Sequence, residues 1–162
     1  LFLRYSLAFL MVNLIGFTVY YLHPAAPPWY VAKYGFEIRF DIPGNAAGLA
    51  RVDTWLGVNL FTSIYSRVSN VFAPLPSLHC AYPFVVLCYV AIARQRLFTG
   101  LAAVFMLGIF FAAVYTGHHY FTDLICGVTC AIVSVTIIEL VMYGIMWFRR
   151  FMTDWKCAIT AQ

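Results

Sequence analysis

The 162-residue chain is 64% hydrophobic and only 10% charged, with a mean hydropathy of +0.86. Soluble domains are closer to one quarter charged, so this composition excludes an ordinary water-soluble protein and indicates a multi-pass membrane protein. The formal charge of +4 comes mainly from basic residues near the ends of apolar segments, a pattern typical of membrane topology signals. It does not resemble a nucleic-acid surface, so no nucleic-acid partner is expected.

The first half of the chain predicts one membrane-spanning helix followed by a long surface segment. Residues 1–22 are almost entirely apolar and, at about 1.5 Å per residue, long enough to span a bilayer. The prolines of "HPAAPPWY" end that helix, and a loop then covers residues 23–76. Within it, apolar residues recur every three or four positions from Val58 to Phe72, which predicts an amphipathic helix that lies at the membrane interface or packs over the bundle.

Three further apolar helices are expected in the second half of the chain. They cover residues 77–93, with a bend at Pro83, residues 97–116 and residues 119–148. The chain starts at Leu1, without Met and inside an apolar run, so we expect the full protein to have additional N-terminal helices. The expected fold is an all-α, multi-pass transmembrane bundle that forms one catalytic domain over all 162 residues.

The order of the helices predicts that most of the histidines meet on one side of the membrane. His79 begins one helix, and the next helix returns to the turn that holds His118, His119 and Asp123. Most basic residues fall on the opposite side: Arg4, Arg94, Arg96, Arg149, Arg150 and Lys156. Cytoplasmic loops are enriched in Lys and Arg, so the histidine side is expected to be extracytoplasmic. We expect a bacterial inner membrane rather than a Golgi membrane.

The spacing of His119 and Asp123 predicts a catalytic pair. Residues four apart share a helix face, and a carboxylate bonded to one imidazole nitrogen makes the other a better base or nucleophile. His79 would be a second proton-handling group, and Ser77 stands at a helix N-terminus that suits a phosphate oxyanion. This set suits phosphoryl transfer without an obligatory metal or cofactor. Spacing alone does not choose the nucleophile among His79, His118 and His119.

Other interpretations of these residues stay open. Interfacial histidines often only form hydrogen bonds, although three histidines and an aspartate at this depth favour a functional site. A metal site would use the same side chains, but His118 and His119 would point about 100° apart on a helix. Trp29 fits a membrane-interface residue and a substrate-lining residue equally well. The five cysteines form no CxxC pair and are expected to be mostly buried apolar residues: Cys80, Cys88, Cys126, Cys130 and Cys157.

Three short motifs resemble those of one enzyme family. "PSLH" at Pro76–His79 and "HYFTD" at His119–Asp123 resemble the two histidine motifs of the type 2 phosphatidic acid phosphatase superfamily. "PAAPPWY" at Pro24–Tyr30, followed by these two motifs in order, resembles its inositol phosphorylceramide synthase branch, which includes bacterial phosphoinositol sphingolipid synthases. The resemblance covers most of the chain, from about Tyr20 to Gly127.

The resemblance implies a role for each motif residue. His119 would attack phosphorus and form a phosphohistidine, and Asp123 would orient and stabilise its ring. His79 would protonate the leaving alkoxide and then deprotonate the incoming hydroxyl. Ser77 would help to hold the phosphate oxygens. We expect further substrate contacts from residues in or beside the motifs: Pro76, His118, Tyr120, Trp29 and Tyr30.

The chain departs from the phosphatase members of the superfamily at two places. Ala112 and Ala113 stand where phosphatases carry a Ser-Arg pair, and the upstream Lys-x6-Arg-Pro motif has no true counterpart near Lys33. Without the guanidinium of that arginine, the site lacks a cation to balance a phosphomonoester dianion, whereas a singly charged diester needs less positive charge. Three loop cations remain candidates to replace it: Arg39, Arg51 and Arg67.

Taken together, the motifs predict a lipid phosphotransferase. It would move a phosphoinositol headgroup from phosphatidylinositol to ceramide or dihydroceramide and release diacylglycerol. Apolar walls would exclude water from the phosphohistidine and so favour transfer over hydrolysis. One alternative is a lipid phosphatase or polyprenyl diphosphatase of the same superfamily. Another is a non-catalytic or metal-binding membrane protein.

Overall fold

The structure of the protein is a computed structural model that describes residues 1–68, 70–146, 148, 150, 151 and 153–155. Its described part is helical and contains no strand, which confirms the all-α class. The elements follow in this order: α1 (Phe2–Leu22), α2 (Pro28–Tyr34), a 3-10 turn (Ala47–Leu49), α3 (Ala50–Leu56), α4 (Leu60–Tyr65), α5 (Leu78–Ile92), α6 (Arg96–Tyr115) and α7 (Phe121–Gly144).

Three of the described helices, α1, α6 and α7, are long and apolar enough to cross a membrane. This agrees with the multi-pass fold predicted from composition. α5 is also apolar but has only 15 residues, fewer than the roughly 20 that a straight span of a bilayer needs. The short length follows from its ends, because Ser77 precedes its first turn and the chain leaves the helix at Ala93.

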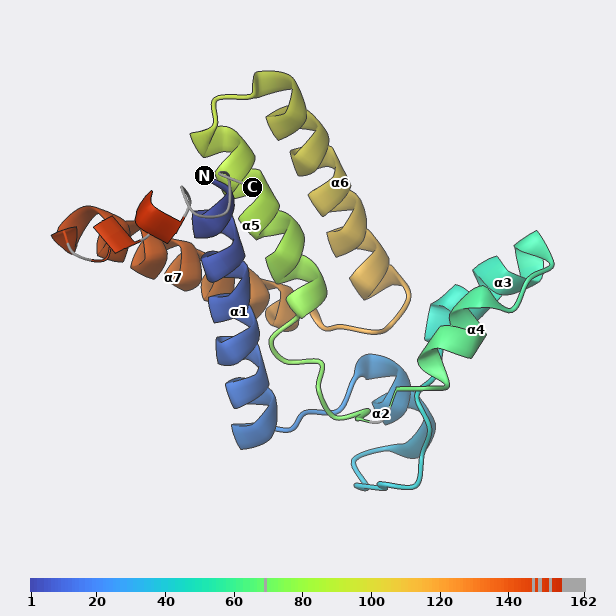
Figure 1. Ribbon diagram of the computed structural model, residues 1–162. Coiled ribbons are helices and arrows are strands. Elements are labelled where there is room, and N and C mark those ends of the chain that lie inside the picture. The colour runs from blue at the N-terminus through green and yellow to red at the C-terminus, as the bar shows by residue number, and fades with distance from the viewer. Residues whose placement is uncertain (69, 147, 149, 152, 156–162) are drawn as a thin grey trace.

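α5 lies in the centre of the bundle and packs against α1, α6 and α7 (Figure 1). Small residues on the neighbouring helices allow this close packing: Ala8 of α1 and Ala131 of α7 are fully buried around Ala81 and Val85. Pro83 lies inside α5, and the helix continues past it to Ile92. The shortest of the four long helices is therefore the one that the others surround.

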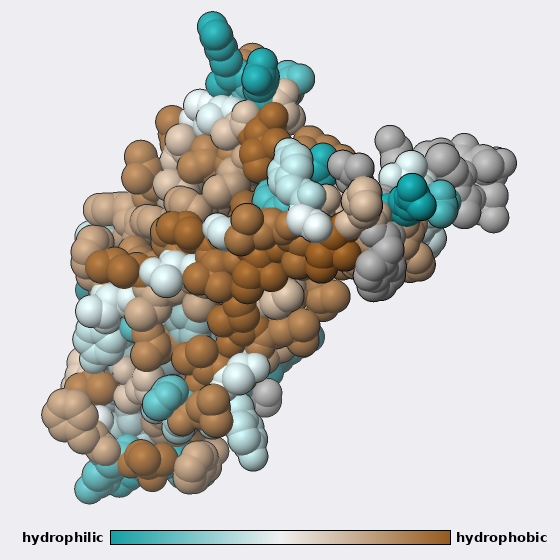
Figure 2. All heavy atoms as spheres, turned by 90° about the vertical axis from the view of Figure 1, so that its left-hand side faces the viewer, coloured by the Kyte–Doolittle hydropathy of each residue, from teal (hydrophilic) through white to brown (hydrophobic). Residues whose placement is uncertain are grey.

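The outer surface of the bundle is mostly apolar. Figure 2 shows a broad hydrophobic band on one face, with hydrophilic residues gathered toward its upper and lower ends. Only Ala113 is buried among the residues of α6. An exposed apolar band between two polar ends is the surface that lipid acyl chains require. Large exposed apolar residues on the long helices include Leu10, Leu14, Leu101, Phe105, Leu107 and Leu140.

The histidine motifs lie at one end of the bundle. The C-terminal ends of α1 and α6 and the N-terminal ends of α5 and α7 meet there, next to α2 (Figure 1). Arg4 lies toward the other end of α1, where its Nη1 atom is 2.8 Å from Glu139 Oε2 of α7. The predicted separation of the histidines from Arg4 is therefore present. Arg149, Lys156 and Cys157 lie outside the described residues.

The predicted amphipathic helix over residues 58–72 was wrong in its extent. α4 covers only Leu60–Tyr65, and α3 precedes it across Gly57, which has a left-handed φ of 66°. The buried Asp53 carboxylate of α3 accepts hydrogen bonds from the Phe61 and Thr62 amides, at 3.0 and 2.8 Å, and so caps α4. Burial opposes the ionisation of Asp53, but these hydrogen bonds prevail and lower its pKa. A short helical hairpin replaces the single helix.

Two other boundaries differ from the prediction. The prolines that end α1 also begin α2, because Pro28 occupies its first turn, where a missing N–H group costs nothing. The last helix was predicted over residues 119–148, but α7 begins at Phe121 and ends at Gly144, followed by Ile145 in an extended conformation. His119 therefore precedes α7 instead of forming part of it.

Candidate active site

His119 and Asp123 form a buried pair at the start of α7. Their side chains are only 8% and 5% exposed, and His119 Nδ1 lies 3.6 Å from Asp123 Oδ2. The same carboxylate oxygen accepts a hydrogen bond of 2.8 Å from the backbone N–H of Tyr120. Asp123 is thus fixed by the first turn of α7, and a small rotation of the imidazole would complete its bond to Nδ1. The structure therefore brings the two predicted side chains together, although His119 lies just before the helix.

His79 approaches this pair from α5. It stands in the first turn of that helix, and its ring centroid is 5.6 Å from that of His119, with 58° between the ring planes. His79 is exposed whereas His119 is buried. Two imidazoles at this separation can contact one phosphate group, with one ring acting as nucleophile and the other as proton donor.

His118 has both ring nitrogens occupied by the chain itself. Nδ1 lies 2.8 Å from the Thr116 hydroxyl and Nε2 lies 3.3 Å from the carbonyl oxygen of Asn45. Its ring also contacts the ring of Tyr65, with centroids 4.4 Å apart. Burial lowers the pKa of His118 to about 4, so its imidazole is neutral at pH 7. A ring held in this way is poorly placed to attack phosphorus, which favours His119 over His118 as the nucleophile.

The loop that carries the histidines is held by backbone hydrogen bonds from three distant segments. The carbonyl of Thr116 accepts from the Gly48 amide at 2.9 Å, and that of Gly117 accepts from the Trp29 amide at 3.0 Å. The carbonyl of Asp123 accepts from the Ser77 amide, also at 3.0 Å. The "PAAPPWY", "PSLH" and "GHHYFTD" motifs therefore converge through main-chain contacts.

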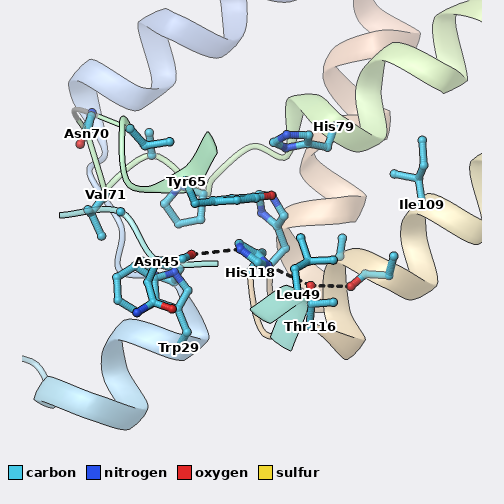
Figure 3. Close-up of a pocket in the computed structure, with 18 of the residues that line it drawn as sticks. Trp29, Asn45, Leu49, Tyr65, Asn70, Val71, His79, Ile109, Thr116 and His118 are labelled. Atoms are coloured by element: carbon cyan, nitrogen blue, oxygen red, sulfur yellow. Dashed lines mark hydrogen bonds between the residues drawn. The ribbon is translucent and has the colours of Figure 1, made fainter. Parts of the chain in front are cut away.

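A pocket of about 270 Å³ opens beside the histidines (Figure 3). Its polar and aromatic lining comprises His79, His118, His119, Thr116, Tyr20, Trp29, Tyr65, Asn45 and Asn70. Ala112 and Ala113 also line it, so the positions of the absent Ser-Arg pair face the pocket. No Asp, Glu, Lys or Arg side chain lines it among the residues that the structure describes. Arg39, Arg51 and Arg67 all lie outside this lining, and Arg39 is 3.3 Å from Glu37.

Four of the predicted substrate contacts lie outside the lining of the pocket: Pro76, Ser77, Tyr30 and Tyr120. Ser77 and Pro76 are buried at the start of α5. The Ser77 hydroxyl lies near the Cys80 thiol but has no partner in the described part of the chain at hydrogen-bonding distance and angle. Tyr30 is fully buried, and its hydroxyl donates to the Glu37 carbonyl and accepts from the Arg39 amide. Tyr120 is 42% exposed. Of the predicted binding residues, Trp29 and His118 are the ones that line it.

The structure adds pocket residues that sequence reasoning missed. Tyr20, Asn45, Tyr65 and Asn70 come from segments that carry no recognisable motif. The periodicity that included Tyr65 suggested a packing face, and it gave no sign of the contact with His118. Within the described residues, no group of three or more His, Cys, Asp or Glu side chains is arranged to hold a metal ion.

A membrane-embedded helical bundle with a buried His-Asp pair and a second histidine at one end has the architecture expected of a lipid phosphatase or phosphotransferase. The profile of the PAP2 superfamily matches residues 1–137, and the chain belongs to this superfamily. The resemblance drawn from the three motifs is thereby confirmed.

The curated relatives point to one branch of this superfamily. The chain is 50% identical to the phosphoinositol dihydroceramide synthase of Bacteroides thetaiotaomicron, over 93% of the chain and 48% of that protein. It is 35% identical to the catalytic subunit of inositol phosphorylceramide synthase of Saccharomyces cerevisiae, over 82% of the chain and 32% of that protein. It is 34% identical to the inositol phosphorylceramide synthase of Candida albicans, over 86% of the chain and 29% of that protein. The chain spans half or less of these relatives, and no solved structure matches it.

Proposed function

We propose that the protein is a lipid phosphotransferase that moves a phosphoinositol headgroup from phosphatidylinositol to ceramide or dihydroceramide and releases diacylglycerol. One observation carries the proposal: His119, backed by Asp123, faces His79 beside a pocket without charged side chains among its described lining residues. The names of the relatives supply the substrate class, since they are synthases of phosphoinositol dihydroceramide and inositol phosphorylceramide.

The first half-reaction uses the two histidines in complementary roles. Asp123 faces Nδ1 of His119, so Nε2 is the nitrogen with a free lone pair, and it attacks the phosphorus of the donor lipid. The bond between phosphorus and the glycerol oxygen breaks, and His79 gives its proton to that oxygen. Diacylglycerol leaves, and the phosphoinositol group stays on His119.

The second half-reaction reverses these roles. Neutral His79 removes the proton from the primary hydroxyl of the sphingolipid acceptor. The oxygen attacks phosphorus, the phosphorus–nitrogen bond breaks, and His119 returns to its starting state. One phosphodiester is made for each one broken, so the exchange needs no external energy source. Apolar walls such as Ile109 and Ala113 favour the lipid hydroxyl over water at this step.

The proposed site lies on the extracytoplasmic face of the membrane. The support is the placement of Arg4 toward the opposite end of α1 and of Arg94 and Arg96 at the turn between α5 and α6. Both substrates are then reached laterally from one leaflet. We favour a bacterial inner membrane because the most similar relative reported above is bacterial.

The deciding experiment measures turnover by the purified full-length protein in detergent. Labelled phosphatidylinositol is supplied with and without ceramide, in the presence of a chelator. We expect diacylglycerol release that depends on ceramide and a labelled inositol-containing sphingolipid. Release of inositol phosphate regardless of ceramide would instead indicate a hydrolase. Loss of turnover in the chelator would contradict a metal-independent route.

A matched pair of histidine variants tests the assigned nucleophile. His119→Ala is expected to lower kcat by about 10³-fold or more while the protein stays folded. His23→Ala is the control, because His23 ends α1 as an exposed residue that does not line the pocket. Wild-type turnover by His119→Ala would refute the phosphohistidine mechanism.

A further inference from the structure

Two carboxamides at the pocket are oriented by the chain itself. Asn45 Oδ1 accepts a hydrogen bond of 2.7 Å from the Ala47 amide, and Asn70 Oδ1 accepts one of 2.9 Å from the Phe72 amide. A backbone N–H can only donate, so the atom facing it must be the side-chain oxygen. Each residue therefore keeps its NH2 group, with two donors, for another partner. Both residues line the pocket.

Asn45 is also connected to the reaction centre. Its backbone carbonyl oxygen lies 3.3 Å from His118 Nε2, and His118 directly precedes His119. In Figure 3, Asn45 and Trp29 lie on one side of His118 and His79 lies on the other, while Asn70 lies farther out beside Val71. A headgroup whose phosphorus is near His79 and His119 would extend from the reaction centre toward these amides.

The charge of the lining determines which headgroups fit. No carboxylate lines the pocket in the described part of the chain, because the Asp123 side chain is buried beside His119 and bonded to the Tyr120 amide. An ammonium or quaternary ammonium headgroup would therefore face amide donors with no anion to balance its charge. A polyol ring carries hydroxyl oxygens that accept hydrogen bonds, and its apolar faces can pack against Trp29 and Tyr65.

We propose that Asn45 and Asn70 form the headgroup subsite, in which their NH2 groups select an uncharged polyol phosphodiester over a cationic phospholipid headgroup. The inference rests on the proposed function, because it names the part of that site that recognises the donor lipid.

Substitution by aspartate separates recognition from local structure. Asn45→Asp and Asn70→Asp keep the oxygen that accepts from the backbone but replace the NH2 donors with an anionic oxygen. Asn45→Ala and Asn70→Ala remove both the accepting oxygen and the NH2 donors. If the amides only stabilised their turns, aspartate would restore function that alanine loses. For donor recognition we expect KM for phosphatidylinositol to rise about 3- to 10-fold in each alanine variant and further in each aspartate variant.

Asn59→Asp is the matched control for added charge. Asn59 lies in the same surface segment, makes no side-chain cap bond to α4 and does not line the pocket. We expect its KM to remain at the wild-type value. An equal rise in KM for Asn59→Asp would mean that general repulsion, and not a lost donor, causes the effect, and would overturn the proposal.

A binding measurement makes this inference independent of the chemical step. In the His119→Ala protein, the rise in unfolding temperature is compared for micelles containing phosphatidylinositol or phosphatidylcholine. We expect a larger rise with phosphatidylinositol, and we expect Asn45→Asp or Asn70→Asp to remove the difference. Selective binding by the His119→Ala protein, together with no transfer by the wild-type protein, would refute only the proposed function. Transfer with equal binding of both lipids, or aspartate variants that behave as wild type, would refute the subsite.

Discussion

Gly127 provides a demanding test of how the site is assembled. It lies one turn after Asp123 in α7, and a Cβ atom there would overlap the carbonyl oxygen of Ser77 and lie 3.1 Å from its carbonyl carbon. These are backbone atoms at the start of α5, and they cannot rotate away. In Gly127→Ala the N-terminus of α5 must therefore move relative to α7.

The size of the effect follows from that overlap. Relief of the contact requires the two backbones to separate by about 1 Å, and overpacking of this kind typically costs about 1–3 kcal/mol of folding free energy. The hydrogen bond between the Ser77 amide and the Asp123 carbonyl, now 3.0 Å, would lengthen by a similar amount. His79 moves with α5 while His119 stays with α7. A displacement of about 1 Å between catalytic groups can lower the rate on the order of 10²-fold.

The assay combines kcat with the unfolding temperature in detergent. Gly127→Ala should lower kcat much more than it changes KM, because the donor subsite lies on other segments. Gly108→Ala is the control, since a Cβ atom at this position on α6 meets no atom within 4 Å among the described residues beyond its chain neighbours and the adjoining helix backbone. There the substitution should be neutral or slightly stabilising. Wild-type turnover and stability in Gly127→Ala would show that α5 and α7 do not approach each other so closely.

Two further predictions concern protonation and the helical hairpin. His118 has its pKa lowered from 6.5 to about 4, so acidification through this range protonates the unfolded chain first and destabilises the fold. At about 1.4 kcal/mol per tenfold change in proton affinity, the complete effect on the free energy of unfolding is on the order of 3 kcal/mol. His118→Gln should therefore show less acid destabilisation than wild type when unfolding is measured from pH 7.5 to 4.5. Asp53→Asn should turn a donor toward the Phe61 or Thr62 amide and accelerate exchange of these amides by roughly tenfold or more at pH 7. Unchanged amide exchange in Asp53→Asn would contradict the capping role.

The long helices could be predicted because their signal is local. A run of some 20 apolar residues must form a helix in lipid whatever its neighbours are, since its backbone groups have no other hydrogen-bond partners. The segment over residues 58–72 lacks such a constraint. Its apolar residues face different partners: Tyr65 contacts the His118 ring, while Phe72 contacts the rings of Tyr30 and Phe40. Their spacing of three and four residues does not reflect one helical face.

The candidate catalytic residues could be picked out from the sequence for a different reason. Ionisable side chains are rare in apolar sequence, so His79, His119 and Asp123 stand out by residue type and order. The groups that hold them in place do not stand out, because backbone amides and carbonyls are present at every position. Gly48 is a partial exception. A Cβ atom at this position would lie 2.7 Å from Thr116 Cα, so the close approach explains why a glycine is present. The sequence alone does not identify Thr116 as the residue that approaches it.

The absent arginine and the neutral pocket lining belong to one electrostatic argument. The cost of transferring an ion into a medium of low dielectric constant rises with the square of its charge, so a monoester dianion pays about four times as much as a diester monoanion of similar size. A cation such as the arginine of the phosphatases would offset most of that cost for the dianion. With Ala112 and Ala113 in the wall, a monoanion is the better match for a pocket whose described lining carries no Lys or Arg. The same lining that disfavours a monoester therefore suits the proposed exchange of one diester for another, and the apolar wall that replaces the arginine would also keep water away from the proposed phosphohistidine intermediate.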